Sequence, residues 1–170
     1  MSDVMTEKTA KAAIDPAELL ERQLAAEEIV TPFSYSKPSE DMGNRALVSL
    51  CKTDLYRAVV TVMKKGWGET NLHYHSHADS FWMVLKGRVR FYGPDDVIIG
   101  EFGPNEGTST PRYSRYWFEN CGDDDLELLH VFANIDPGNH KNGRTDAVER
   151  PAHMPKVGSS SKKYDAAIKR

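Results

Sequence analysis

Long apolar runs are missing from this chain, and so is a strong excess of either charge. The apolar runs all fall far short of the roughly 20 residues that a helix needs to cross a bilayer. The sequence has 22 lysines and arginines against 25 aspartates and glutamates, for a formal net charge of -3. We therefore expect neither a nucleic-acid partner nor a membrane-surface role.

Cysteine is scarce as well. Cys51 and Cys121 are the only two, and residues 1–16 are charged, without the apolar core of a signal peptide. Two well-separated thiols in that context are expected to be reduced, and we expect a cytoplasmic protein. Internal repeats, a phosphate-binding glycine loop and a serine-nucleophile motif are also absent from the sequence.

One short helix is predicted near the start of the chain. Asp15 followed by Pro16 is a typical helix start, with a capping side chain before proline at the first helical position. Leucines then recur near a helical period as far as Ile29. We predict that residues 1–30 form an arm and an amphipathic helix, which packs on the domain or on a partner subunit.

The next hundred residues have a different pattern. From Val30 to Ile135 the chain consists of short segments rich in β-branched and aromatic residues, separated by Gly, Pro, Asp and Asn. Such a series indicates an all-β sandwich or barrel. No long helical pattern interrupts it, so the crossover helices of a parallel sheet are missing. We predict a single antiparallel β-barrel over residues 31–135, since 170 residues are enough for one domain with a proper core.

The remaining residues, 136–170, are polar and rich in Pro, Gly and Ser, with no clear apolar period. We predict an extended C-terminal segment that runs along the barrel or along another subunit. Its part after Pro155 is expected to be loose, so that removing it would leave the thermal transition almost unchanged.

The stretch with the most chemistry runs from Asn71 to Gly87. His73 and His75 project to the same side if this stretch is a strand. Two imidazoles placed in that way are ready ligands for a transition metal. The alternative is a solvent-facing edge that happens to be rich in histidine. An imidazole pair leading into a buried strand favours the ligand interpretation.

Around these histidines, from about Val59 to Phe132, the chain resembles the single-domain cupins. Two motifs carry the resemblance: Gly68, His73-Tyr74-His75 and the strand ending at Gly87, then Gly100 to Pro104 with Pro111 and Asn120. The resemblance implies a cupin-type antiparallel β-barrel, or jelly roll, with a cavity for a small molecule at one end.

Two positions depart from the cupin pattern. Ser80 stands where the family has a glutamate, with Asp79 one place earlier, and Tyr116 stands where the family has its second-motif histidine. Only His73 and His75 therefore carry over directly as ligands. A carboxylate or phenolate oxygen with two imidazoles still suits a divalent iron, manganese, zinc, nickel or copper ion. We predict a metal site formed by these two histidines with Asp79 and Tyr116, the aspartate turning in at a β-bulge.

Further candidates surround this site. His77 has the parity to act as a third imidazole, and His130 could join if its strand turns it inward, although a core histidine is the simpler interpretation. Without a metal, Tyr116, a histidine and Asp79 would act as acid and base. The predicted substrate pocket is lined by Ser80, Trp82, Phe118, His130 and Arg112, the last as an anion-binding candidate at the cavity mouth.

The same strand suggests an assembly. Phe81, Met83 and Leu85 point to the face opposite the pocket and would be exposed on a lone barrel. Cupins commonly dimerise through such faces, and the segment Phe33 to Tyr35 also needs apolar cover. We therefore predict a homodimer.

Three functions stay open at this point. The first is a metal-dependent enzyme acting on a small organic substrate, as a dioxygenase, isomerase, decarboxylase or lyase. The second is a metal-free cyclase or isomerase, and the third is a non-catalytic cupin that binds a small ligand. We favour the first, because a pocket-facing His-x-His pair is easiest to understand if it coordinates something.

Overall fold

The computed structural model describes residues 14–39, 42–136, 143–148 and 161–168. The predicted arm before Ile14 lies outside these ranges. Contacts divide the chain into a unit up to Pro32 and a second unit from Phe33 onward. Within the described residues, no helix is long and apolar enough to cross a membrane.

The first unit carries helix α1 (Pro16–Glu28). The Asp15 side chain accepts a hydrogen bond from the backbone N–H of Ala17 at 2.7 Å, which satisfies one of the free donors at the helix start. Pro16 occupies the first turn, where its missing N–H costs nothing. The predicted short N-terminal helix is confirmed, and the surface on which it packs stays a prediction.

The second unit is built from strands. In chain order they are β1 (Phe33–Ser34), β2 (Arg45–Lys52), β3 (Tyr56–Met63), β4 (Gly68–His75), β5 (Ala78–Lys86), β6 (Val89–Tyr92), β7 (Ile98–Phe102), β8 (Gly107–Thr110), β9 (Tyr116–Asn120), β10 (Leu126–Asn134), β11 (Arg144–Val148), β12 (Lys162–Asp165) and β13 (Ala167–Ile168). The 3-10 turn η2 (Pro94–Asp96) lies between β6 and β7. Between residues 30 and 135, the part of the chain that the structure describes holds no α-helix, as the turn-rich pattern predicted.

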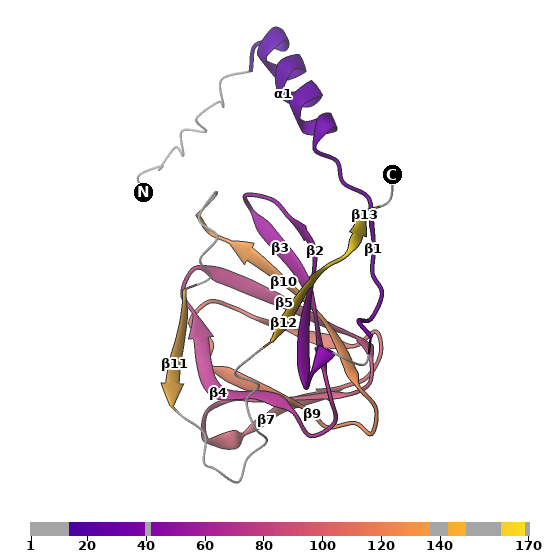
Figure 1. Ribbon diagram of the computed structural model, residues 1–170. Coiled ribbons are helices and arrows are strands. Elements are labelled where there is room, and N and C mark those ends of the chain that lie inside the picture. The colour runs from indigo at the N-terminus through magenta and orange to yellow at the C-terminus, as the bar shows by residue number, and fades with distance from the viewer. Residues whose placement is uncertain (1–13, 40–41, 137–142, 149–160, 169–170) are drawn as a thin grey trace, which may run out of the picture. The chain divides into compact units, whose positions relative to one another are not determined.

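The strands form two facing sheets, seen in Figure 1. One has the order β12-β2-β3-β10-β5-β8 and the other β11-β4-β9-β6-β7, while β1 and β13 form a separate pair. Every pairing among the described strands is antiparallel except that of β12 with β2. The predicted all-β, mainly antiparallel architecture is confirmed.

Alternation along each strand fills the space between the sheets. On β5, Ser80, Trp82 and Val84 are buried, whereas Phe81 and Leu85 are exposed. The resulting core contains Met63, Trp82, Val84, Val89, Phe91, Tyr116, Phe118, Leu126 and Leu128. Trp82 and Phe118 thus face inward, as their parity predicted.

Gly87 ends β5 because no other residue fits there. Its φ of +84° lies in the left-handed region, and an added Cβ would come within 2.8 Å of the carbonyl oxygen of Asp125. The chain can therefore turn directly from β5 into β6. The turn leads the chain from one sheet into the other.

A second apolar cluster involves both ends of the second unit. It consists of Met42, Ala46, Val48, Val60 and Val62, and Tyr35, Leu50, Leu129, Tyr164 and Ala166 pack against it. The Tyr35 hydroxyl also donates a hydrogen bond to Glu127 Oε2 at 2.6 Å. Tyr35 thus packs within its own chain, whereas Phe33 of the same segment remains exposed, and the predicted homodimer stays a prediction.

The C-terminal extension is part of the sheets. β11 pairs with β4, β12 runs parallel to β2, and β13 pairs with β1. The expectation of a loose segment after Pro155 is wrong for residues 162–168. Backbone pairing with β2 supplies most of this order, and such pairing leaves no apolar period in the sequence.

Candidate functional site

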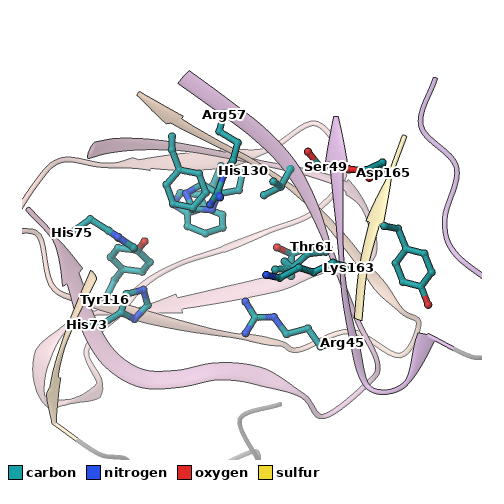
Figure 2. Close-up of a pocket in the computed structure, with 15 residues that line it drawn as sticks. Arg45, Ser49, Arg57, Thr61, His73, His75, Tyr116, His130, Lys163 and Asp165 are labelled. Atoms are coloured by element: carbon teal, nitrogen blue, oxygen red, sulfur yellow. The ribbon is translucent and has the colours of Figure 1, made fainter. Parts of the chain in front are cut away.

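A cavity of about 270 Å³ lies inside the second unit, drawn in Figure 2. Alternate residues of several strands line it, because side chains two apart share one face of a strand. The lining residues are Arg45, Leu47 and Ser49 of β2, Arg57, Val59 and Thr61 of β3, His73 and His75 of β4, Trp82 of β5, Tyr116 of β9, His130 and Phe132 of β10, and Lys163, Tyr164 and Asp165 of β12.

The two predicted ligand histidines lie together in this lining, and both are buried. The ring centroids of His73 and His75 are 5.2 Å apart, with the rings nearly perpendicular. His73 Nδ1 lies 2.8 Å from the backbone oxygen of Asn71. A carbonyl oxygen can only accept, so Nδ1 carries the proton and the lone pair of the neutral ring is on Nε2. This tautomer leaves Nε2 as the donor atom for a metal.

Tyr116 reaches the histidines through strand register. In the β4–β9 ladder it lies directly opposite His73. Its ring centroid is 4.6 Å from that of His73 and 6.2 Å from that of His75. Residues more than forty positions apart in sequence are therefore brought together at one wall of the cavity.

His130 also lines the cavity, on β10. Its ring stacks on that of Trp82, with the two ring centroids 3.4 Å apart. The centroid of the Phe132 ring lies 3.6 Å from that of His130. Burial, followed by the nearby His75 and Arg57, lowers the pKa of His130 well below its ordinary value. Its Nε2 is buried without a hydrogen-bond partner among the described residues. His130 is thus a neutral imidazole of the pocket, as one of the two interpretations of the sequence had it.

Asp79 and Arg112 do not line the cavity. Asp79 Oδ1 accepts a hydrogen bond from the Arg112 backbone N–H at 2.8 Å and lies 3.2 Å from Arg112 Nε. The Asp79 side chain is 54% exposed. Alternation explains this, because Asp79 lies between the buried Ala78 and Ser80 and so points to the other face of β5. The predicted roles of Asp79 as ligand and base, and of Arg112 in the pocket, are corrected.

Three other candidates also stay outside the lining. Ser80 and Phe118 are buried, but as part of the packing between the sheets. Ser80 Oγ has no hydrogen-bond partner in the described part of the chain. His77 is half-buried, with Nδ1 2.7 Å from Ser76 Oγ, and therefore does not serve as a third imidazole of this group.

Several lining residues were missed at the sequence level, among them two arginines. Arg45 and Arg57 stand at the starts of β2 and β3, in phase with the cavity-lining residues that follow them. The guanidinium of Arg57 lies 4.8 Å from the centre of the Phe132 ring, within cation–π range. An arginine in the inward phase of an otherwise apolar strand was the signal that could have found Arg57.

The donors at the histidine end fit a transition metal better than a hard cation. No group of three or more His, Cys, Asp or Glu side chains is positioned for a metal among the described residues. What converges in the cavity wall is two imidazoles and one phenol, while Asp146, which lies opposite His73 in the β4–β11 ladder, does not line the cavity. Imidazole and phenolate suit Fe, Zn, Cu or Ni, whereas Ca²⁺ and Mg²⁺ prefer carboxylate and carbonyl oxygens.

Comparisons with known proteins place the fold. A crystal structure of an uncharacterized conserved protein with a double-stranded β-helix domain from Klebsiella pneumoniae is similar, with 20% identity, a TM-score of 0.54 and coverage of 68% of this chain and 92% of that one. An RmlC-like cupin from Methanocaldococcus jannaschii has 16% identity, a TM-score of 0.48 and coverage of 59% and 90%.

A third structure is Bacillus subtilis oxalate decarboxylase, described with Mn(II) centers, at 17% identity and a TM-score of 0.45, where 54% of this chain covers 24% of that one. A search of curated proteins found no match. Residues 59–132 match the family model of the cupin domain. This match spans the strands that hold the His73–His75 pair and Tyr116 inside two facing sheets, so this part of the chain is a cupin domain.

Proposed function

We propose that this protein is a metal-dependent enzyme that converts a small organic substrate held in the cavity. One observation carries the proposal: His73, His75 and Tyr116 converge, buried, on one wall of a cavity of about 270 Å³. That volume lies just below the roughly 300–1,000 Å³ of typical ligand pockets, so a metabolite-sized molecule fits. Dioxygenase, isomerase, decarboxylase and lyase reactions are all compatible with this arrangement.

The three converging side chains would each have a separate role. The Asn71 carbonyl fixes the tautomer and orientation of His73, so that Nε2 is presented without a rearrangement. His75 adds a second imidazole from the same face of β4. Tyr116 serves as a third ligand through its oxygen or as a proton donor to substrate. A divalent transition metal held here would supply Lewis-acid polarisation of a substrate oxygen.

A metal-free cyclase or isomerase is the second candidate. It is favoured by the scarcity of carboxylates in the described cavity lining, which contains only Asp165, on β12. In that case Tyr116 would act as the acid and an imidazole as the base. A cavity that binds its ligand without turnover would make the protein a non-catalytic binding cupin.

We also propose an oligomeric state and a cellular location for the protein. The protein would assemble as a homodimer through the β5 face that bears Phe81, Met83 and Leu85. A cytoplasmic location stays a prediction, and it is supported by Cys51 and Cys121, which are both free thiols.

Elemental analysis of untagged protein tests the metal. We expect close to one divalent transition metal per chain, and loss of that metal together with activity in His73→Ala and in His75→Ala, because each removes a primary ligand. His77→Ala is the matched control, since this histidine follows β4 directly but lies outside the cavity. Its metal content should equal that of the wild type.

Tyr116→Phe separates the two roles of the phenol. It keeps the ring and its packing but removes the oxygen. Metal affinity should fall, by about tenfold or more, if the oxygen coordinates, and turnover alone should fall if it donates a proton. Tyr116→His should tighten the site by supplying a third imidazole. A wild-type protein that stays metal-free after incubation with iron, manganese, zinc, nickel and copper would overturn the metal proposal and promote the acid–base one.

A further inference from the structure

Positive charge is concentrated in the cavity of a protein whose net charge is negative. Among the described residues that line the cavity, Arg45, Arg57 and Lys163 are cationic and Asp165 is the one carboxylate, although the whole chain carries a formal charge of -3. A partly enclosed cavity with low-dielectric walls focuses such a charge. The cavity is therefore suited to an anion.

Arg57 is the best placed of these cations. It is half-buried at the start of β3, and its guanidinium rests over the Phe132 ring at 4.8 Å. That contact limits the conformations of the side chain, so less entropy is lost when a ligand binds. No acidic side chain pairs with Arg57 among the described residues, and a half-buried guanidinium is stabilised by an anionic partner.

The two arginines lie apart from the histidine group. In Figure 2, His73, His75 and Tyr116 are on the left, Arg57 is above beside His130, Arg45 is below, and Lys163 reaches toward the middle from β12 on the right. The wall also contains the apolar Leu47, Val59, Trp82 and Phe132. A molecule with an apolar body and an acidic group can thus contact both a guanidinium and the histidine group.

We propose that the substrate is a small organic carboxylate with an apolar body, bound through its carboxylate by Arg57, while Arg45 adds positive charge to the same cavity. A guanidinium offers a planar fork that matches a carboxylate with two parallel hydrogen bonds. The inference rests on the proposed function, because it names the substrate class of the same cavity. Family membership does not supply it, since Arg45 and Arg57 both lie outside the residues that match the cupin model.

Calorimetric titration of the full-length protein with three probes tests this. Benzoate carries the proposed acid, benzamide is its neutral counterpart, and phenyl phosphate carries the other common anion. We expect benzoate to bind about tenfold more tightly than benzamide, and Arg57→Gln to weaken benzoate by a similar factor while benzamide is unaffected. Arg45→Gln should weaken benzoate as well.

The controls isolate the charge from the fold. Arg57→Lys keeps the charge but loses the fork, so it should retain part of the benzoate preference. Arg88→Gln is the matched control, because Arg88 lies in the turn between β5 and β6, is about half exposed and does not line the cavity. Its benzoate affinity should equal that of the wild type. If Arg57→Gln fails to fold, the carboxylate assignment is still tested by the preference of the wild type for benzoate over benzamide and by the benzoate affinity of Arg45→Gln.

The outcomes distinguish this inference from the proposed function. Equal binding of benzoate and benzamide, tighter binding of phenyl phosphate, or no binding of benzoate at millimolar concentration would each overturn the carboxylate assignment. Metal content is measured on the same samples. If the wild-type protein holds metal but does not prefer benzoate over benzamide, only the carboxylate inference is contradicted. If it is metal-free and prefers benzoate, only the metal proposal is contradicted.

Discussion

Asp125 links three segments of the second unit through a single carboxylate. Its Oδ2 accepts hydrogen bonds from Lys37 Nζ at 2.6 Å and from Lys64 Nζ at 3.0 Å. Burial by itself would raise the pKa of Asp125, but the two lysines outweigh that effect and hold the pKa below its usual range. The folded state therefore favours the ionised form.

This shift has a defined pH dependence. A carboxyl whose pKa is lowered on folding stabilises the protein above its unfolded pKa, about 4, and the contribution is lost as the pH falls toward the folded value. At pH 7 we expect Asp125→Asn to lower the free energy of unfolding by about 1 kcal/mol, limited by solvent because both lysines are about one third exposed. Urea unfolding at pH 7 and pH 3 measures the difference, which should shrink at the lower pH.

Asp123→Asn is the matched control for this effect. Asp123 also pairs with a lysine, Lys65, at 2.6 Å, but its side chain is 96% exposed. A pair in full contact with water contributes little, so this variant should match the wild type. If Asp125→Asn and Asp123→Asn lost equal stability, the less exposed ion pairs of Asp125 would not stabilise the fold more than the exposed pair of Asp123.

At the scale of elements, β12 has two structural roles. It pairs along β2, which would otherwise be the edge of its sheet with unpaired N–H and C=O groups. It also supplies Lys163, Tyr164 and Asp165 to the cavity wall. Barrel stability and cavity shape are thus both tied to a short strand far from the cupin motifs.

Deletion of residues 161–170 should therefore lower the melting temperature by several degrees. Loss of the Tyr164 and Ala166 packing and of the strand pairing costs stability, and about 1 kcal/mol corresponds to 2–4 °C in a domain of this size. Differential scanning calorimetry measures the change. Deletion of residues 169–170 alone is the control, since β12 and β13 remain. An unchanged melting temperature in the longer deletion would contradict the pairing.

On the level of assembly, the relevant feature is the exposed apolar surface on the outer face of β5. Phe81 is 48% exposed and Leu85 is 37% exposed, with Met83 half-buried between them. An open hollow formed by Phe81, Trp82, Met83 and residues 105–109 adjoins them. Contiguous apolar surface of this kind is typical of an interface.

We predict a homodimer that Phe81→Glu dissociates, because a charge would be buried on both sides of a two-fold contact. Light scattering at micromolar concentration measures the mass of each species. Ile98→Glu, at another exposed apolar position, on β7, is the control and should stay dimeric. A monomeric wild type, or dissociation by the control alone, would contradict the assignment of the interface to β5.

Much of this architecture could be predicted from the sequence. The capped helix start at Asp15, the turn-separated strands, the glycine that ends β5 and the shared face of His73 and His75 are local properties, set by backbone sterics and by alternation along one strand. They do not depend on which segments come together, so they could be identified without coordinates.

The tertiary structure alone decided which strands pair and which face of each is enclosed. The β4–β9 register placed Tyr116 beside His73, the inward face of β5 excluded Asp79, and β3 turned Arg57 into the cavity. Alternation says only that residues two apart share a face. The choice of the inner face follows from the packing of side chains distant in sequence, and the order of β12 comes from backbone hydrogen bonds to β2, which any side-chain pattern can form.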